Sequence, residues 1–131
     1  MINSDFEPGE GLRIVVVDDN QRDIELIAET LQPNFPCTIR AVTTKDALLS
    51  EFDFAIPDVV VSDSNVPGFS GLLALKVVTE KFPRVPFVFC SGSESEELKN
   101  QALWCGATAW VPKVNLAGLV TIVKEVCCVP D

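Results

Sequence analysis

The sequence contains no histidine, and this absence excludes several classes of enzyme. Cys-His catalysis, the serine triad and most zinc sites all need an imidazole. Basic residues are also scarce: 10 Lys and Arg stand against 19 Asp and Glu, and the formal net charge is −9. Because nucleic acid is bound through clustered Lys and Arg, direct binding of DNA or RNA is not expected, whereas a metal cation suits an acidic surface.

Long apolar runs are missing too. No stretch approaches the ~18 residues that span a bilayer, and the first ten residues, MINSDFEPGE, are acidic where a secretion signal is basic and then apolar. We therefore expect a cytoplasmic protein without a membrane partner. The 131 residues, of which 47% are hydrophobic, suit one folded domain. Residues 1–11 are predicted to form a flexible leader and residues 12–131 the domain.

The five cysteines lack the CxxC spacing of redox and metal motifs. Three stand singly in apolar stretches, and two are adjacent near the end of the chain. We expect them to be reduced core thiols. They are Cys37, Cys90, Cys105, Cys127 and Cys128.

Short apolar runs rich in β-branched residues alternate about five times with longer stretches in which apolar residues recur at helical spacing. Two of the runs contain VVV, which is typical of strands covered on both faces. The alternation predicts an α/β fold, in which a parallel sheet carries helices on both faces. The predicted strands are residues 12–17, 38–42, 59–61, 87–90 and 109–111, and amphipathic helices are predicted within 24–31 and 116–123.

Some of the predicted helices carry start and stop signals. Ser93 and Glu96 have the spacing of a capping box, which predicts a helix from there to about Trp104. Gly106 is placed to end that helix. Asn115 is placed to cap the last helix of the chain.

Polar and charged residues follow the predicted strands. In an open α/β sheet, ligands bind beyond the carboxyl ends of the strands. The residues after the first, third, fourth and fifth strands are, in that order, Asp18 and Asp19, Asp63, Ser91, and Lys113. Three neighbouring carboxylates repel one another, and a hard divalent cation such as Mg²⁺ removes that repulsion. Singly, each residue is explained as a helix cap, a turn former or a solvated side chain, but their joint placement predicts a site.

These residues stand in four motifs that resemble the receiver domains of two-component signalling, the CheY-like response regulators. PDVVVSDSNVPGFSG is similar to the third strand and following loop of that family, with Asp63 as the phosphate-accepting aspartate and Pro67 and Gly71 in the loop. VVVDDN, FVFCSGS and GATAWVPK match the acidic pair, the Thr/Ser and the lysine. The resemblance covers residues 12 to about 127. It implies a doubly wound, flavodoxin-like sheet of five parallel strands in the order 2-1-3-4-5.

The resemblance implies phosphoryl transfer to Asp63 from a histidine kinase, a histidine phosphotransfer protein or a small phosphodonor, in a two-component system or phosphorelay. Such a protein catalyses only its own phosphorylation and dephosphorylation, so no other enzyme activity is expected. The implied ligands of Mg²⁺ or Mn²⁺ are Asp18, Asp19, Asp63 and the backbone carbonyl of Asn65. Lys113 and Ser91 are implied to bind phosphoryl oxygens.

Signalling in this family couples the Thr/Ser to an aromatic residue three positions before the lysine, here Ser91 and Trp110. A shift of Ser91 would open space for the ring and remodel the surface of the fourth helix, fifth strand and fifth helix, where a downstream effector or dimer partner would bind. From the residues alone, simple packing of Trp110 against the neighbouring helix is an equal alternative.

The sequence departs from the family at three places. The lysine is usually followed by proline, often with a cis bond; here Val114 follows, so the bond is either strained or trans. Ser91 and Gly92 replace the commoner Thr-Ala and leave the loop less constrained. Asn65 and Ser93 occupy positions that tune hydrolysis of the acyl phosphate in the family. Both are uncharged, and we expect an intermediate lifetime, measurable as the decay of radiolabelled protein.

Three other functions use a similar fold. A pseudo-receiver is an interaction module that is never phosphorylated. A flavodoxin-like FMN binder offers hydroxyls and amides after its first strand, where this chain offers Asp18 and Asp19. An aspartate-nucleophile phosphatase carries D-x-D there, which Asp18, Asp19 and Asn20 do not match. The sequence leaves open whether the chain is a stand-alone regulator, a phosphorelay shuttle or a part of a larger hybrid protein.

Overall fold

The computed structural model describes residues 11–66 and 68–129, and its central element is a five-stranded parallel sheet. The strand order is β2-β1-β3-β6-β7. Because β4 and β5 form a separate small hairpin, this order is the predicted 2-1-3-4-5, and the predicted fold is confirmed. The strands are β1 (Leu12–Val17), β2 (Cys37–Val42), β3 (Val59–Ser62), β6 (Phe87–Ser91) and β7 (Ala109–Pro112). Apart from Gly11, the predicted leader lies outside the described residues.

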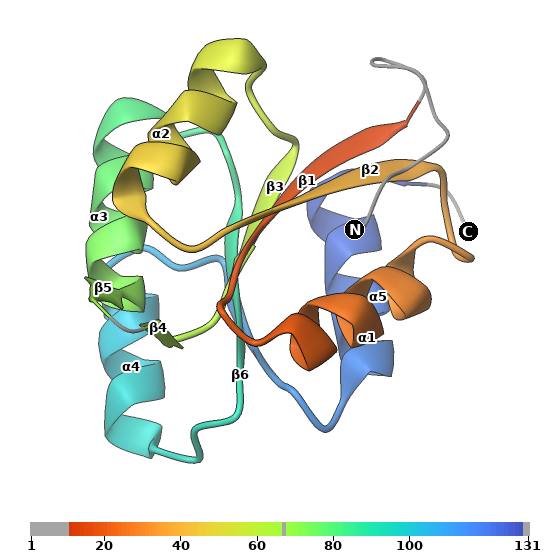
Figure 1. The fold of residues 1–131 in the computed structure, drawn as a ribbon. Coiled ribbons are helices and arrows are strands. Elements are labelled where there is room, and N and C mark those ends of the chain that lie inside the picture. Colours follow the sequence, from red (N-terminus) through yellow and green to blue (C-terminus); the bar gives the residue numbers. More distant parts are fainter. Residues whose placement is uncertain (1–10, 67, 130–131) are drawn as a thin grey trace.

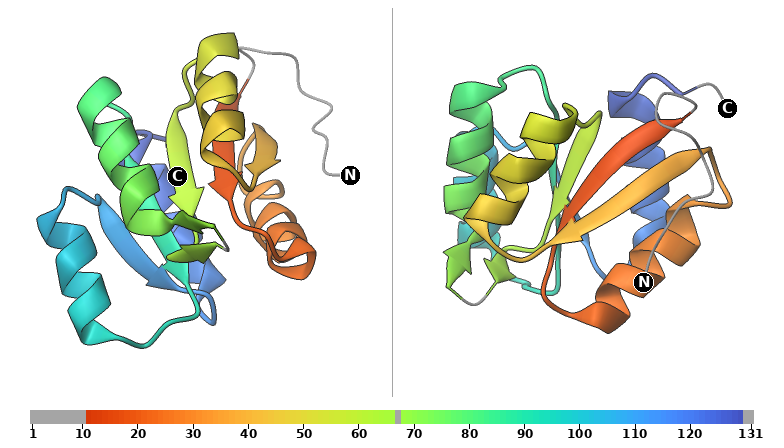
Figure 2. Two further views of the ribbon diagram at one scale, coloured as in Figure 1. Left: turned by 60° about the vertical axis from the view of Figure 1, so that its left-hand side comes forward. Right: turned by 45° about the horizontal axis from the view of Figure 1, so that its top comes forward.

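Helices cover both faces of the sheet (Figure 1 and Figure 2). α1 and α5 pack on one face, and α2, α3 and α4 pack on the other. Their bounds are Gln21–Leu31 for α1, Lys45–Phe54 for α2, Gly71–Lys81 for α3, Glu96–Trp104 for α4 and Leu116–Val126 for α5. In the described part of the chain, every helix is too short or too polar to cross a membrane.

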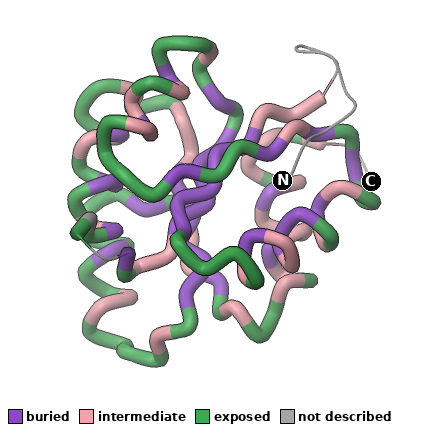
Figure 3. Tube along the Cα trace, in the orientation of Figure 1, coloured by how far each residue is buried: buried purple, intermediate pink, exposed green. Residues whose placement is uncertain are grey.

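The central strand β1 shows how one apolar run supplies two cores. Ile14, Val15, Val16 and Val17 are each no more than 1% exposed. Ile14 and Val16 pack beneath α1 and α5, whereas Val15 and Val17 pack beneath α2 and α3, because successive side chains of a strand point to opposite faces. Figure 3 shows the buried residues running through the middle of the molecule. Burying each such side chain contributes about 1.5–3 kcal/mol.

Four of the five strands are one residue longer than predicted, and β1 has the predicted bounds. β2 starts one residue early, at Cys37, and β3, β6 and β7 end one residue late, at Ser62, Ser91 and Pro112. The two serines are buried, and their hydroxyls have partners; that of Ser62 donates to the backbone carbonyl of Asp63 at 2.8 Å. A polar residue with its hydrogen bonds satisfied can therefore stay in a buried strand, which an apolar pattern does not reveal.

The helix cap predicted at Ser93 is wrong. The cap of α4 is Ser95, whose hydroxyl accepts the backbone N–H of Leu98 at 3.1 Å. The hydroxyl of Ser93 instead accepts the backbone N–H of Ser95 at 3.2 Å, and its own N–H donates to the hydroxyl of Ser91 at 3.0 Å. Ser93 therefore belongs to the turn that links the end of β6 to α4.

The other two helix signals are confirmed. Gly106 has a φ of 111°, a left-handed conformation that favours glycine, and the N–H of Ala107 donates to the carbonyl of Ala102 at 3.0 Å across the end of α4. The side chain of Asn115 accepts the N–H of Gly118 at 3.1 Å and so caps α5.

A hairpin between Asp63 and α3 is absent from the sequence-based prediction. β4 (Asn65–Val66) pairs antiparallel with β5 (Phe69–Ser70). Gly68, in the turn, has a φ of 74°. The predicted loop residue Pro67 lies outside the described residues. The hairpin carries the chain from the end of β3 directly into the first turn of α3.

The prediction that all cysteines are core thiols is wrong for two of them. Cys37 and Cys90 are buried, and burial raises the pKa of Cys37 to about 11 and that of Cys90 to about 12. Cys105 and Cys128 are exposed and Cys127 is partly exposed, because they lie just beyond the ends of α4 and α5. All five are free thiols.

Candidate functional site

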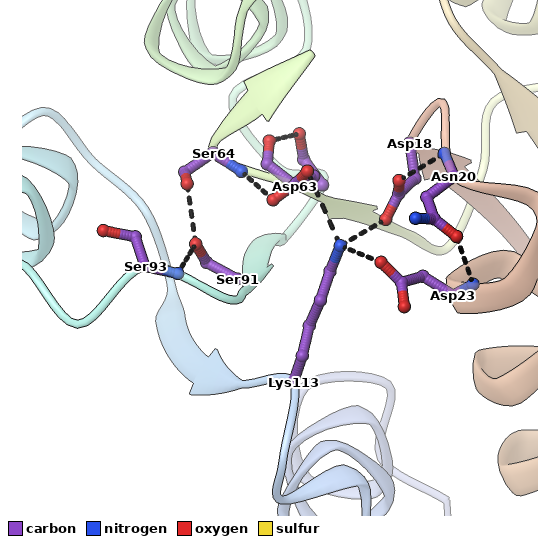
Figure 4. A network of polar contacts seen from close by, with 9 residues as sticks. Asp18, Asn20, Asp23, Asp63, Ser64, Ser91, Ser93 and Lys113 are labelled. Carbon is purple, nitrogen blue, oxygen red and sulfur yellow. Dashed lines mark hydrogen bonds and ion pairs between the residues drawn. The ribbon is translucent and has the colours of Figure 1, made fainter.

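The carboxyl ends of β1, β3, β6 and β7 meet at one edge of the sheet, and the predicted site residues lie there (Figure 4). Asp18 and Asp19 directly follow β1, and Asp63 directly follows β3. Ser91 is the last residue of β6, and Lys113 follows β7. Because these strands are parallel neighbours, their ends face the same crevice, as the sequence predicts.

Three carboxylates gather at this edge. One oxygen each of Asp18, Asp19 and Asp63 lies within 4.8 Å of the others. Asp18 is only 1% exposed; its Oδ1 accepts the backbone N–H of Asn20 at 2.9 Å, while its buried Oδ2 faces the Lys113 ammonium at 3.0 Å. Asp19 is exposed to solvent, and Asp63 is partly exposed. The cluster is therefore open on one side and buried on the other.

Lys113 places its ammonium among these acids. Its Nζ lies 3.0 Å from Oδ2 of Asp18 and 3.5 Å from Oδ2 of Asp63. Its shortest contact is a hydrogen bond of 2.6 Å to Oδ2 of Asp23, in the first turn of α1. Burial by itself lowers the pKa of Lys113, but the hydrogen bond to Asp23 and the charges of the other acids outweigh burial and raise the pKa above its usual value.

The environment of Asp63 disfavours its ionised form. Burial raises the pKa of this carboxyl above its usual value, and the neighbouring charge of Asp18 acts in the same direction. Lys113 and the backbone N–H of Ser64, which donates to Oδ1 of Asp63 at 2.8 Å, lower the pKa but do not cancel the effect of burial. Oδ2 is left facing the crevice beside the Lys113 ammonium.

The donor set fits a hard divalent cation. Lys113 supplies one positive charge to a cluster that also contains three carboxylates, so negative groups outnumber positive ones there. A divalent cation offsets the repulsion among these carboxylates, and Mg²⁺ prefers carboxylate oxygens and water as ligands. Asn65, the fourth predicted ligand, is the exposed first residue of β4 and is joined to Asp63 through Ser64.

A chain of hydroxyls connects the acids to β6. The hydroxyl of Ser91 lies 2.6 Å from that of Ser64, whose backbone N–H is hydrogen-bonded to Asp63. Ser91 is buried, so this contact and the N–H of Ser93 satisfy its oxygen. The site thus includes two residues that the sequence analysis missed, Ser64 and Asp23. Ser64 is adjacent to Asp63, and Asp23 lies in the first turn of the helix that follows Asp18 and Asp19, so proximity to the acids was the available signal.

Trp110 lies on β7 beside Phe89 of β6, with the ring centroids 5.3 Å apart and an interplanar angle of 36°. The indole is partly buried against the core beneath α2, α3 and α4. This packing accords with the alternative in which Trp110 is simply a packed aromatic residue. Phe89 is two residues before Ser91 on the same strand, so the two side chains lie on the same face of the sheet.

Val114 stands where proline usually follows the lysine in the family, and the Lys113 side chain still points into the site. No cis peptide bond occurs among the described residues, so the Lys113–Val114 bond is trans, one of the two alternatives that the sequence left open. The backbone N–H of Lys113 donates to the carbonyl of Ser91 at 2.9 Å, which fixes the start of the loop after β7. The side chain of Val114 is exposed to solvent.

Comparisons with known proteins identify the same kind of domain. A family model of the response regulator receiver domain matches residues 14–124. The chain is 32% identical over 108 residues to a protein-glutamate methylesterase/protein-glutamine glutaminase of Nitrobacter winogradskyi, covering 79% of this chain and 25% of that protein. It is 26% identical over 100 residues to the DNA-binding transcriptional regulator NtrC of Salmonella typhimurium, covering 76% and 21%.

Solved structures agree with this match. The BeF3-activated DrrB receiver domain has a TM-score of 0.78 and 25% identity to this chain, and the alignment covers 88% of this chain and 96% of that one. By contrast, the chain spans only 25% and 21% of the two curated relatives. The similarity to those relatives therefore concerns a domain of each protein and not the whole protein.

Proposed function

The chain belongs to the response regulator receiver domain family, and from this premise we propose that it is a phosphoacceptor in a two-component system or phosphorelay. Its donor is a histidine kinase or a histidine phosphotransfer protein, and its acceptor is Asp63. The observation that carries the proposal is the cluster of three carboxylates around the Lys113 ammonium at the carboxyl edge of the sheet. In this proposal the protein promotes only its own phosphorylation and dephosphorylation, and it acts in the cytoplasm.

The proposed reaction is a single phosphoryl transfer. Oδ2 of ionised Asp63 attacks the phosphorus of the donor, a new P–O bond forms, and the bond from phosphorus to the donor's histidine nitrogen breaks. The electron pair of that bond stays on the imidazole nitrogen, and Asp63 becomes an acyl phosphate. Because Oδ1 accepts the N–H of Ser64, the carboxylate is held in one orientation with Oδ2 open to the donor.

The surrounding residues supply charge and orientation. Asp18, Asp19, Asp63 and the backbone carbonyl of Asn65 are the proposed ligands of Mg²⁺ or Mn²⁺. When bound, the cation neutralises charge that develops on the phosphoryl oxygens. Lys113, whose Nζ already lies 3.5 Å from Oδ2 of Asp63, pairs with a phosphoryl oxygen, and the Ser91 hydroxyl donates a hydrogen bond to another.

The output of the proposed switch lies at the face formed by α4, β7 and α5. To reach the phosphoryl group, the Ser91 hydroxyl gives up its contact with Ser64, and the end of β6 shifts. Phe89 on the same strand packs against Trp110, so the indole has to adjust. A downstream effector or a dimer partner reads the changed face.

Mass spectrometry after incubation with acetyl phosphate and Mg²⁺ tests the acceptor. The native chain should gain one phosphoryl group, and Asp63→Asn should gain none because the amide is a poor nucleophile. Asp53→Asn, an exposed carboxylate of α2 away from the site, is the matched control and should gain one phosphoryl group. Phosphorylation that persists in Asp63→Asn, or that never occurs in the native chain, contradicts the proposal.

Beryllofluoride, which mimics an acyl phosphate, separates a working receiver from a passive interaction module. Trp104, the last residue of α4, is 89% exposed and would add its own emission to that of Trp110, so the measurement uses the Trp104→Phe variant, in which Trp110 is the single indole. Emission of Trp110 should change when beryllium, fluoride and Mg²⁺ are present together. No change, together with no phosphorylation, would favour the pseudo-receiver.

A further inference from the structure

The shortest contact of the Lys113 ammonium is with an acid outside the predicted phosphoacceptor set. Its Nζ lies 2.6 Å from Oδ2 of Asp23, compared with 3.0 Å to Asp18 and 3.5 Å to Asp63. Figure 4 shows the ammonium between Asp23, which α1 supplies, and Asp63, which directly follows β3. The lysine thus binds most closely to a carboxylate on α1, and not to the predicted acceptor Asp63.

Asp23 is held in place by the helix start. The backbone N–H of Asp23 donates to the side chain of Asn20, the cap of α1, at 3.1 Å. Its carboxylate stands in the first turn of α1, where the positive end of the helix dipole stabilises a negative charge. The side chain is 28% exposed against 18% for Lys113, so the ion pair is only partly screened by solvent. The pair is therefore a built feature of the site and not a chance surface contact.

We infer that Asp23 is an intramolecular competitor of the phosphoryl group for Lys113. The inference rests on the proposed function of Asp63. When Asp18, Asp19 and Asp63 engage a cation, Asp23 is the remaining carboxylate in contact with Lys113 in the described structure. An arriving phosphoryl group then meets an ammonium that is already hydrogen-bonded and a further negative charge at its side.

Two physical effects of Asp23 act in the same direction. The charge-assisted hydrogen bond between Lys113 and Asp23 has to be weakened before the ammonium can bind a phosphoryl oxygen, and this weakening costs free energy. The Asp23 carboxylate also repels an anion that binds beside Lys113. Removing the charge of Asp23 should therefore tighten the binding of a phosphoryl mimic.

The test is a beryllofluoride titration at saturating Mg²⁺, followed by Trp110 emission in the Trp104→Phe background. Asp23→Asn should lower the half-saturating concentration about tenfold, a change typical of losing one charged hydrogen bond. The amplitude at saturation should stay the same, because the bound state does not use Asp23. Asp23→Glu keeps the charge and should restore weaker binding.

Asp46→Asn is the matched control. Asp46 is an exposed aspartate in the first turn of α2, so this variant makes the same change in net charge and in helix position away from Lys113. Its half-saturating concentration should equal that of the parent. A similar tightening in both variants would mean that total charge, and not the contact with Lys113, decides binding.

A double-mutant cycle tests whether Asp23 acts through the lysine. In Lys113→Met, competition for the ammonium is absent, so the effect of Asp23→Asn should shrink to the smaller part that direct repulsion of the anion supplies. An undiminished effect, an unchanged half-saturating concentration in Asp23→Asn, or weaker binding in that variant would each overturn the inference while leaving Asp63 as acceptor. Failure of the parent to respond to beryllofluoride would overturn the inference, and the proposed function would fall with it if the parent also gained no phosphoryl group from acetyl phosphate.

Discussion

The start of α3 fits against the acceptor loop so closely that a single methyl group should disturb it. A Cβ on Gly71 would lie 2.7 Å from the carbonyl oxygen of Asp63, 2.8 Å from Cε1 of Phe89 and 2.9 Å from Cα of Ser64. Two of these atoms belong to the backbone and cannot rotate away. Because non-bonded carbon atoms prefer separations of about 3.5–4.0 Å, Gly71→Ala has to push α3 and the loop apart.

The expected cost follows from two opposing effects. Overpacking of a well-packed site costs about 1–3 kcal/mol. Alanine returns about 0.4–1 kcal/mol, because it restricts the unfolded chain more than glycine does. Gly71→Ala should therefore lower the free energy of unfolding by about 1–2 kcal/mol, or the melting temperature by roughly 4–8 °C.

Gly92→Ala is the comparison that makes this prediction sharp. Gly92 also borders the site, but the nearest atom to a Cβ there is Cδ of Lys113 at 4.0 Å, an ordinary contact. This variant should be unchanged or more stable by about 0.4–1 kcal/mol. Urea unfolding followed by circular dichroism measures both, with midpoints compared at constant slope. Equal stability of the two variants, or a Gly71→Ala as stable as the parent, would refute the reasoning.

Two further predictions concern the cap of α5 and the reactivity of the cysteines. Asn115→Ala removes the side chain that accepts the N–H of Gly118, so the free energy of unfolding should fall by about 1 kcal/mol, and an unaltered thermal melt would contradict the assignment of the cap. Iodoacetamide at pH 8 should modify the exposed Cys105 and Cys128 of the native protein first, whereas Cys37 and Cys90 should react only after unfolding, because burial raises their pKa to about 11 and about 12 and leaves almost no thiolate. Peptide mapping checks the order, and early labelling of Cys90 would show that the sheet opens.

The fold and the position of the site were predictable because both follow from pattern. Strands covered on both faces are continuous apolar runs, and the first run lies in a strand whose side chains alternate between two cores. Once the strands are parallel, the residues that follow them must share one edge. Asp18, Asp63 and Lys113 could therefore be placed together from their positions after the first, third and fifth runs.

The details that the sequence analysis missed depend on which of several possible hydrogen bonds forms. Ser93 has a glutamate three residues later and Ser95 does not, yet Ser95 is the cap because the hydroxyl of Ser93 is already bonded to the N–H of Ser95. The pairing of Lys113 with Asp23 joins residues 90 positions apart and depends on the reach of a flexible side chain. Sequence spacing alone therefore does not decide which of these contacts forms.

One aromatic ring has a consequence for the use of this protein in solution. Phe89 packs against Trp110 on one side, and its Cε1 occupies the space beside the first residue of α3, where Gly71 has no side chain. Interiors are packed without spare volume, so a tilt of α3 that moves this ring also alters what the indole touches. The emission of Trp110 should therefore report the position of α3 against the sheet. A shift in its emission wavelength can be measured without attaching a dye.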